Sequence, residues 1–142
     1  MERKNPTTID LVTLVAGGIV VVGSLLDFYD YSDFGASISR SAWSSDLFSP
    51  VTLIPVLCAA VAIVHVALSS FTGVKLPERF LGLGWSQIHV AVGFQATVMM
   101  IAFLIQEKDP YGIAIGFWLM LLGSVAMLVA AVGRQRGVTL SD

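Results

Sequence analysis

The chain alternates between long stretches without a charged residue and short polar connections. Uncharged, largely apolar windows of 16, 28, 27 and 24 residues separate groups of Asp, Glu, Lys and Arg. A helix rises about 1.5 Å per residue, so roughly 20 residues cross the hydrocarbon core of a bilayer. The pattern therefore predicts four membrane-spanning helices joined by three connections.

The predicted fold class is all-α: a membrane four-helix bundle made of one domain that covers residues 1–142. We expect the spans at Ile9–Phe28, Pro50–Ser70, Gly84–Ile105 and Tyr111–Val132. The first is short, because only 16 residues separate Asp10 from Asp27. These two aspartates are therefore expected at the membrane interfaces, unless the bilayer thins locally. No convincing cleavage site follows this span, which favours an uncleaved signal-anchor.

Composition supports the membrane assignment. Hydrophobic residues make up 56% of the chain and charged residues 13%, against about 25% charged in soluble domains. The net charge of −2 offers no electrostatic footprint for DNA or RNA. These values exclude a disordered protein, a soluble enzyme domain and a nucleic-acid binder, and they make the lipid bilayer the first predicted partner.

The basic residues predict the orientation. Cytoplasmic connections of membrane proteins carry an excess of Lys and Arg. The N-terminus, second connection and C-terminal tail hold six: Arg3, Lys4, Lys75, Arg79, Arg134 and Arg136. The other two connections hold Arg40 and Lys108. We therefore expect a multi-pass protein of the plasma (inner) membrane with both termini in the cytoplasm and an outward loop of about 21 residues, numbered 29–49.

The outward loop is the longest polar feature and the main candidate for specific recognition. Its sequence is compatible with a short hairpin that turns near Ser32 to Gly35. As a flat cap over the bundle, the loop would use Phe34, Ile38 and Trp43 as its apolar face. Asp27, Asp30 and Asp33 would share one face of a helix and attract a cation. However, calcium needs six or more oxygen ligands, so a solvated acidic rim explains them better.

Small residues indicate where the helices pack closely. The fourth span carries Gly112, Gly116 and Gly123, of which the first two form a small-x-x-x-small motif. We expect these glycines to serve packing within one bundle. The alternative is a dimerisation face on the fourth span, which would make the protein a homo-oligomer.

Two histidines are the main ionisable residues inside the spans, where function is usually sought. His65 and His89 fall at similar depth on the two helices that flank the second connection. We expect each to hydrogen-bond across helices to Gln or Ser; the alternative is ligation of a metal or haem. Gln95 lies on another face of the third span and is expected to bond to a neighbouring helix, or to line a polar cavity.

Several short motifs resemble those of a group of small four-span membrane proteins of actinobacteria. They are Asp27-Phe28-Tyr29, Ser41-Ala42-Trp43, Leu76-Pro77, Leu81-Gly82-Leu83 and Gln87-Ile88-His89, together with a Leu-x-Pro start of the second span. The resemblance covers nearly the whole chain. It implies a four-span topology and carries no catalytic residue.

The sequence holds no Gly-rich phosphate loop, no Ser/His/Asp set and no zinc motif. We therefore expect no enzymatic activity and no cofactor. The predicted function is that of a structural, scaffold or accessory subunit that acts on a membrane-protein partner through its outer loop or helix faces. One alternative is a small oligomeric transporter or channel. The other is a haem or metal redox protein that uses His65 and His89.

Overall fold

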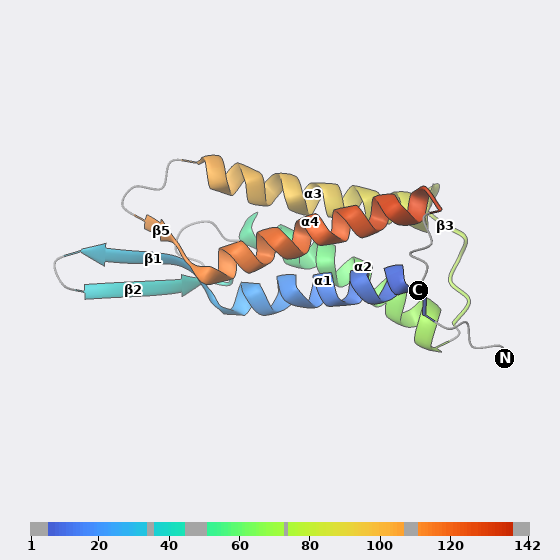
Figure 1. Cartoon of the computed structure of the whole chain (residues 1–142), viewed down its shortest axis with the longest axis horizontal. Helices are drawn as coiled ribbons and strands as arrows, with labels where there is room; N and C mark the ends of the chain where they lie inside the picture. Colours follow the sequence, from blue (N-terminus) through green and yellow to red (C-terminus); the bar gives the residue numbers. More distant parts are fainter. Residues whose placement is uncertain (1–5, 34–35, 45–50, 73, 107–110, 138–142) are drawn as a thin grey trace.

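The computed structural model describes residues 6–33, 36–44, 51–72, 74–106 and 111–137, and these form a helical bundle with a small sheet at one end (Figure 1). The long helices are α1 (Thr8–Leu25), α2 (Ile54–Ala67), α3 (Trp85–Ile105) and α4 (Ile115–Gln135). A 3₁₀ turn at Val51–Leu53 and a π-helical turn at Leu68–Thr72 extend α2 at its two ends. Within the described residues, four helical segments of 18, 22, 21 and 21 residues are long and apolar enough to cross a membrane. This confirms the helical character of the four predicted spans and identifies a multi-pass membrane architecture.

Two of the predicted span boundaries are wrong, because strands replace the helix ends. Strand β1 (Asp27–Asp33) follows α1, and strand β5 (Tyr111–Ile113) precedes α4. With β2 (Ala36–Ser41) they form an antiparallel sheet in the order β2-β1-β5. The all-α class therefore describes the bundle but omits this sheet. Residues 27, 30 and 33 belong to a strand, so they do not share one face of a helix.

Strands β1 and β2 pair as the arms of a hairpin in the loop after the first predicted span, and residues 34 and 35 of the predicted turn lie outside the described residues. Asp33 pairs with Ala36 and Tyr31 pairs with Ile38 in the antiparallel register. The predicted flat cap is wrong, since the sheet extends beyond the helices along the long axis of the bundle (Figure 1). A single residue, Leu26, separates α1 from β1, so the strand continues in the direction of the helix. Phe34, which the cap would have used, lies outside the described residues.

An aromatic cluster closes the sheet end of the bundle. The side chain of Phe28 is completely buried. Its ring meets Tyr29, Phe117 and Phe103 edge to face, at centroid distances of 4.6, 5.4 and 5.9 Å. Each such aromatic pair contributes about 0.5–1.5 kcal/mol beyond simple burial. The cluster therefore ties the base of the sheet to α3 and α4.

Hydrogen bonds hold the chain after β2 against the end of α1. The backbone N–H of Ala42 donates to the Ser24 carbonyl at 3.2 Å, and Thr52 Oγ1 donates to the Ala42 carbonyl at 2.6 Å. Trp43 Nε1 donates to Ser24 Oγ at 3.0 Å while about half of the Trp43 side chain stays exposed. The sheet is thus attached to the bundle at several points and does not hang from a free linker.

Helices α1 and α4 approach until their backbones touch. A Cβ atom on Gly116 would lie 2.5 Å from the carbonyl oxygen of Gly23, and a Cβ on Gly123 would lie 2.7 Å from that of Ala16. Gly93 similarly brings α3 against the backbone of Leu128 in α4. Only glycine fits at such contacts. Gly116 and Gly123 therefore lie inside one bundle, between its first and last helices.

Gly112 has a different role from its neighbours on the fourth span. It lies in β5, opposite Asp30 of β1, and the Asp30 carboxylate occupies the space that a Cβ would need. Because Gly112 precedes the helix, it does not share a helical face with Gly116. The expected small-x-x-x-small motif is therefore absent from α4 at these two positions.

We predict that Gly116→Ala lowers the free energy of unfolding by about 1–3 kcal/mol, because the new methyl group overlaps the α1 backbone. The matched control is Gly18→Ala, where a Cβ would meet nothing within 4 Å. That change should be neutral, or stabilising by up to about 1 kcal/mol through helix propensity. Unfolding in mixed detergent–SDS micelles measures both. Equal effects of the two substitutions would contradict the close contact.

Candidate functional site

Polar side chains from all four helices gather at the end of the bundle opposite the sheet. We call it the basic end, because the α2–α3 connection there carries Lys75 and Arg79, and the end of α4 carries Arg134 and is followed by Arg136. The cluster contains Asp10 from α1, His65 and the nearby Ser70 from the α2 segment, His89 and Trp85 from α3, and Arg134 from α4.

An ion pair joins the first helix to the last. Arg134 Nη2 donates to Asp10 Oδ1, and only 22% and 15% of the two side chains remain exposed. Asp10 Oδ2 also accepts hydrogen bonds from the Thr7 N–H at 3.0 Å and from Ser70 Oγ at 3.3 Å. Thr7 Oγ1 accepts in turn from the Asp10 N–H, which completes a capping box at the start of α1.

Sequence reasoning placed Asp10 at an interface and missed its partner. The Thr7-x-x-Asp10 spacing signals a helix start, but it does not show which other helix end lies beside it. That neighbour follows from the antiparallel α1–α4 contact, which brings the first turn of α1 next to the last turn of α4. Charge pairing at this level satisfies two groups that would otherwise be costly to hold near hydrocarbon.

The two histidines touch each other. Their ring centroids are 4.8 Å apart and the rings meet edge to face at 88°. The Trp85 indole stacks on the His65 ring at 4.0 Å and 18°, and Phe80 continues the row at 6.0 Å from Trp85. The structure thus brings together the pair that the sequence placed at equal depth, and it adds two aromatic residues to them.

The expected hydrogen bonds from the histidines to Gln or Ser are not formed by the buried nitrogens. His65 Nδ1 and both ring nitrogens of His89 have no partner among the described residues. Gln87 Oε1 instead accepts from the Gly84 N–H at the start of α3. Gln95 is exposed on α3 and does not lie between helices. At about 100° per residue, both glutamines lie well over 90° around the helix from His89.

Cofactor ligation fits this packing poorly. Two axial histidines need a slot between them that is wide enough for a porphyrin. Here the two imidazoles are in direct contact, and the Trp85 indole covers one face of His65. Among the described residues, no group of three or more His, Cys, Asp or Glu side chains converges as a metal site would require. The geometry therefore describes a packed aromatic row.

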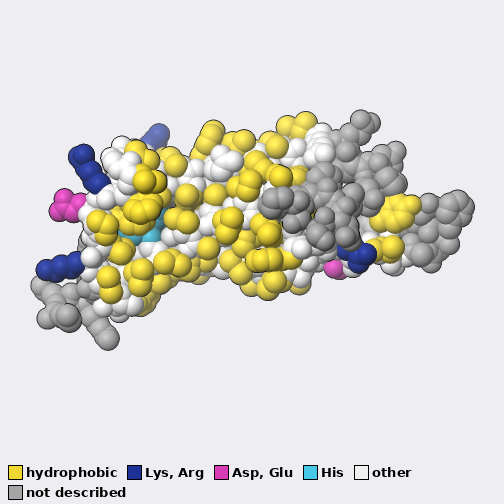
Figure 2. Space-filling view, turned by 180° about the vertical axis from the view of Figure 1, so that it is seen from behind, with side chains coloured by type: hydrophobic (Ala, Val, Ile, Leu, Met, Phe, Trp, Pro, Cys, Tyr) yellow, Lys and Arg dark blue, Asp and Glu magenta, His cyan; other side chains and the backbone are white. Residues whose placement is uncertain are grey.

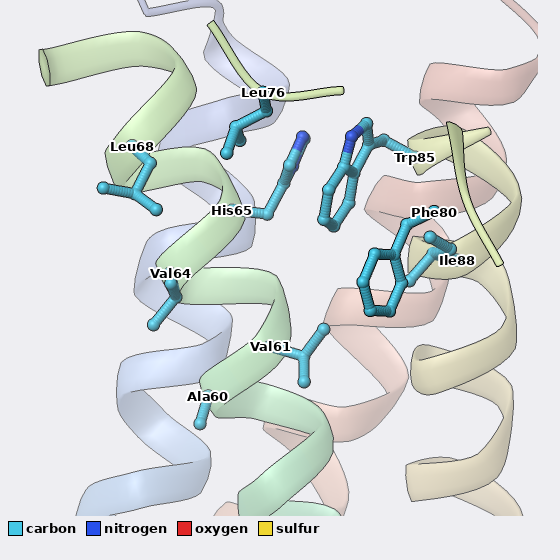
Figure 3. A pocket seen from close by; sticks show the side chains of 9 residues that line it. All are labelled: Ala60, Val61, Val64, His65, Leu68, Leu76, Phe80, Trp85 and Ile88. Atoms are coloured by element: carbon cyan, nitrogen blue, oxygen red, sulfur yellow. The ribbon is translucent and has the colours of Figure 1, made fainter. Parts of the chain in front are cut away.

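An apolar cavity of about 380 Å³ lies against this row (Figure 3). Its walls come from α2, from the connection between α2 and α3, and from the first turn of α3. The lining residues are Ala60, Val61, Val64, His65, Leu68, Leu76, Phe80, Trp85 and Ile88. Trp85 Nε1 donates to the Pro77 carbonyl at 2.8 Å, which holds the connection in place as one wall.

The remaining candidates lie far from this cavity. Trp43 and Gly112 belong to the sheet end, whereas Gly116 and Gly123 lie along the α1–α4 contact. The cavity and the connection that covers it were not expected from the sequence. The apolar and aromatic residues in the range 76–85 were the sequence feature that could have indicated a cavity wall. They form one only because the connection folds back over α2.

No protein-family model, no curated protein and no solved structure matches this chain. The resemblance described above assigns roles to no residue. The features that bear on function are the sheet, the polar cluster and the cavity.

We predict a coupling free energy of about 1–3 kcal/mol between Asp10 and Arg134, the range for a charge-assisted hydrogen bond that is largely shielded from water. A double-mutant cycle with Asp10→Asn and Arg134→Gln, read from unfolding free energies, measures it. The control cycle replaces Arg136, an exposed neighbour, with Gln. Its coupling to Asp10 should stay within about 0.5 kcal/mol of zero. Additivity in both cycles would show that the pair contributes nothing.

Proposed function

We propose that this protein is a non-catalytic accessory subunit of the plasma membrane that holds a partner protein at the outer surface through its projecting sheet. The main observation that supports this proposal is the sheet β2-β1-β5. It is built from two segments distant in sequence and attached to α1 and the α2 segment by hydrogen bonds, and it extends beyond the helices (Figure 1). A rigid platform of this kind presents a fixed surface to a partner at low entropic cost.

The distribution of basic residues supports the orientation with both termini in the cytoplasm. Six of the eight Lys and Arg residues precede α1 in the sequence, fall in the α2–α3 connection or fall at and after the last turn of α4. The sequence places Arg40 and Lys108 in the other two connections. The positive-inside tendency therefore favours the basic end in the cytoplasm and the sheet outside.

The two faces of the sheet differ in chemistry. Tyr29 lies beside Arg40 and Ile113 in the register, and Tyr31 lies beside Ile38. Because residues directly opposite in neighbouring strands share a face, this face carries Tyr29, Tyr31, Ile38 and Ile113 together with the basic Arg40. Tyr29 is buried at its base, and Ile38 is 46% exposed. The other face carries the pair of Asp30 and Ser39.

Strand β2 lies at one edge of the sheet and pairs with β1 on its inner side. Its residues 37–40 are exposed. An exposed edge strand is a template for an added strand from another protein, with backbone hydrogen bonds for affinity and side-chain contacts for selectivity. The proposed partner therefore contributes an extended extramembrane segment that pairs with β2 and covers Ile38.

The interior of the bundle supports the alternative transporter function less well than the sheet supports an accessory role. Phe117, Met100, Met120 and Val20 are completely buried and fill the space between the helices. A water-filled path along the axis of one copy would have to displace them. The packed axis fits a protein whose working surface is on its outside.

We predict that residue 39 is accessible from outside the cell and residue 75 is not. In a Cys58→Ala background, Ser39→Cys should react with a membrane-impermeant maleimide in intact cells. Lys75→Cys should react only after permeabilisation. The reverse pattern would overturn the orientation, and labelling of both in intact cells would overturn the four-span topology.

We predict that Ile38→Asp lowers recovery of the partner by about tenfold or more, since a charge at the centre of an apolar contact costs at least about 1.4 kcal/mol. The control is Ser39→Asp, which adds the same charge to the opposite face of β2. Partner proteins are cross-linked in cells to position 37 of each variant. Quantitative mass spectrometry then compares the amount of partner recovered with Ile38→Asp and with Ser39→Asp. Equal recovery from both variants would contradict a partner on the face that carries Ile38.

A further inference from the structure

The cavity beside His65 opens on the outside of the bundle. Val61, Val64 and Phe80 line it and are 43%, 54% and 51% exposed. In a membrane, the outer surface of these helices faces lipid chains and not water. A hollow of about 380 Å³ falls within the usual size of small-molecule sites, about 300–1,000 Å³. Whatever fills it enters from the hydrocarbon phase.

The walls are suited to an alkyl chain. All lining residues except His65 and Trp85 carry purely aliphatic or phenyl side chains. The indole N–H of Trp85 is already bonded to Pro77, and the His65 ring lies flat against Trp85 (Figure 3). The cavity therefore presents carbon surface, and it offers shape and dispersion contacts to a chain of methylene groups.

Basic residues adjoin the lining of the cavity along the chain, and we call this part of the α2–α3 connection its rim. Lys75 directly precedes the lining residue Leu76, and Arg79 directly precedes the lining residue Phe80; both basic residues are exposed. Glu78 is exposed in the same connection, so the rim retains one net positive charge from these three groups. Figure 2 shows basic side chains around this end of the molecule and a histidine visible within the hydrophobic surface. An anionic group at the level of the headgroups complements this rim.

The connection also displays an apolar tip. A two-stranded hairpin, β3 (Arg79–Phe80) with β4 (Leu83–Gly84), turns at Leu81 and Gly82, which have φ values of 53° and 79°. Leucine rarely adopts this left-handed conformation, and here its side chain is 87% exposed. An exposed Leu next to basic residues is the pattern of a segment that dips into the headgroup boundary of a bilayer. The cavity therefore lies where lipid headgroups and chains meet.

We propose that this cavity binds one acyl chain of an anionic phospholipid, whose headgroup is held by Lys75 and Arg79. The inference requires the membrane placement of the four helices. It does not require the partner proposed for the sheet, so the two proposals fail independently. The site would tie the protein to membrane regions rich in acidic lipid and would reinforce the orientation that its basic end already favours.

Trp85 lines the cavity and reports on its occupant. In a background with Trp43→Phe and Trp118→Phe, Trp85 is the single tryptophan of the chain. The protein is reconstituted in phosphatidylcholine vesicles that contain brominated-chain phosphatidylglycerol or, in parallel, brominated-chain phosphatidylcholine. Bromine quenches indole fluorescence on contact. We expect phosphatidylglycerol to quench at a mole fraction on the order of tenfold lower, because basic residues near the surface attract an anionic headgroup.

Two sets of variants separate the chain from the headgroup. Ala60→Phe fills the cavity and should abolish the selective quenching. Its matched control, Ala91→Phe, adds the same bulk at an exposed position of α3 and should retain it. Lys75→Gln with Arg79→Gln should make the two brominated lipids equivalent. Circular dichroism verifies that each variant remains helical.

Three results would overturn the proposal. The first is equal quenching by the two brominated lipids in the parent protein. The second is a preference for phosphatidylglycerol that survives Ala60→Phe, which would indicate a headgroup contact without a chain site. The third is a loss of preference in Ala91→Phe as large as that in Ala60→Phe. None of these results bears on partner recovery through Ile38, so failure of this proposal is distinguishable from failure of the accessory-subunit role.

Discussion

The backbone contact between α1 and α4 is the constraint on which the rest of the structure depends. Lipid gives helices little hydrophobic reason to associate, so close approach and dispersion must hold them together. Gly116 and Gly123 remove the side chains that would keep the two helices apart. Because the first and last helices are thereby neighbours, the bundle closes, and segments from the two halves of the chain meet at each of its ends.

The contact between α1 and α4 has different consequences at the two ends of the bundle, because different segments meet there. At one end, the contact places β5 beside β1, so residues 111–113 complete a sheet that the loop after α1 begins. At the other, it brings Arg134 to Asp10. Both solutions satisfy polar groups at the ends of the apolar helices, one through backbone pairing and the other through charge. The buried ring of Phe28 separates the sheet from the helical interior.

The histidine pair shows how a residue pattern that suggests chemistry is resolved by packing. The sequence placed His65 and His89 at similar depth on two antiparallel helices, and the structure shows that their rings are in contact. Their surroundings, however, are indole and imidazole faces, and not hydrogen-bonding side chains. His65 forms part of the wall of an apolar cavity. The lipid site that we propose there rests on the aliphatic lining and the adjoining basic residues.

The amino-acid sequence alone determined the four helical spans, the hairpin after the first of them, the equal depth of the two histidines and the asymmetry of basic residues. These features depend on local hydrophobicity, periodicity and charge, which residues carry by themselves. Tertiary structure decided four other features. They are the third strand at Tyr111–Ile113, the Asp10–Arg134 pair, the packing of Gly123 against α1 and the cavity beside Trp85. Each of them joins segments far apart in the chain, and only the choice of neighbouring helices brings those segments together.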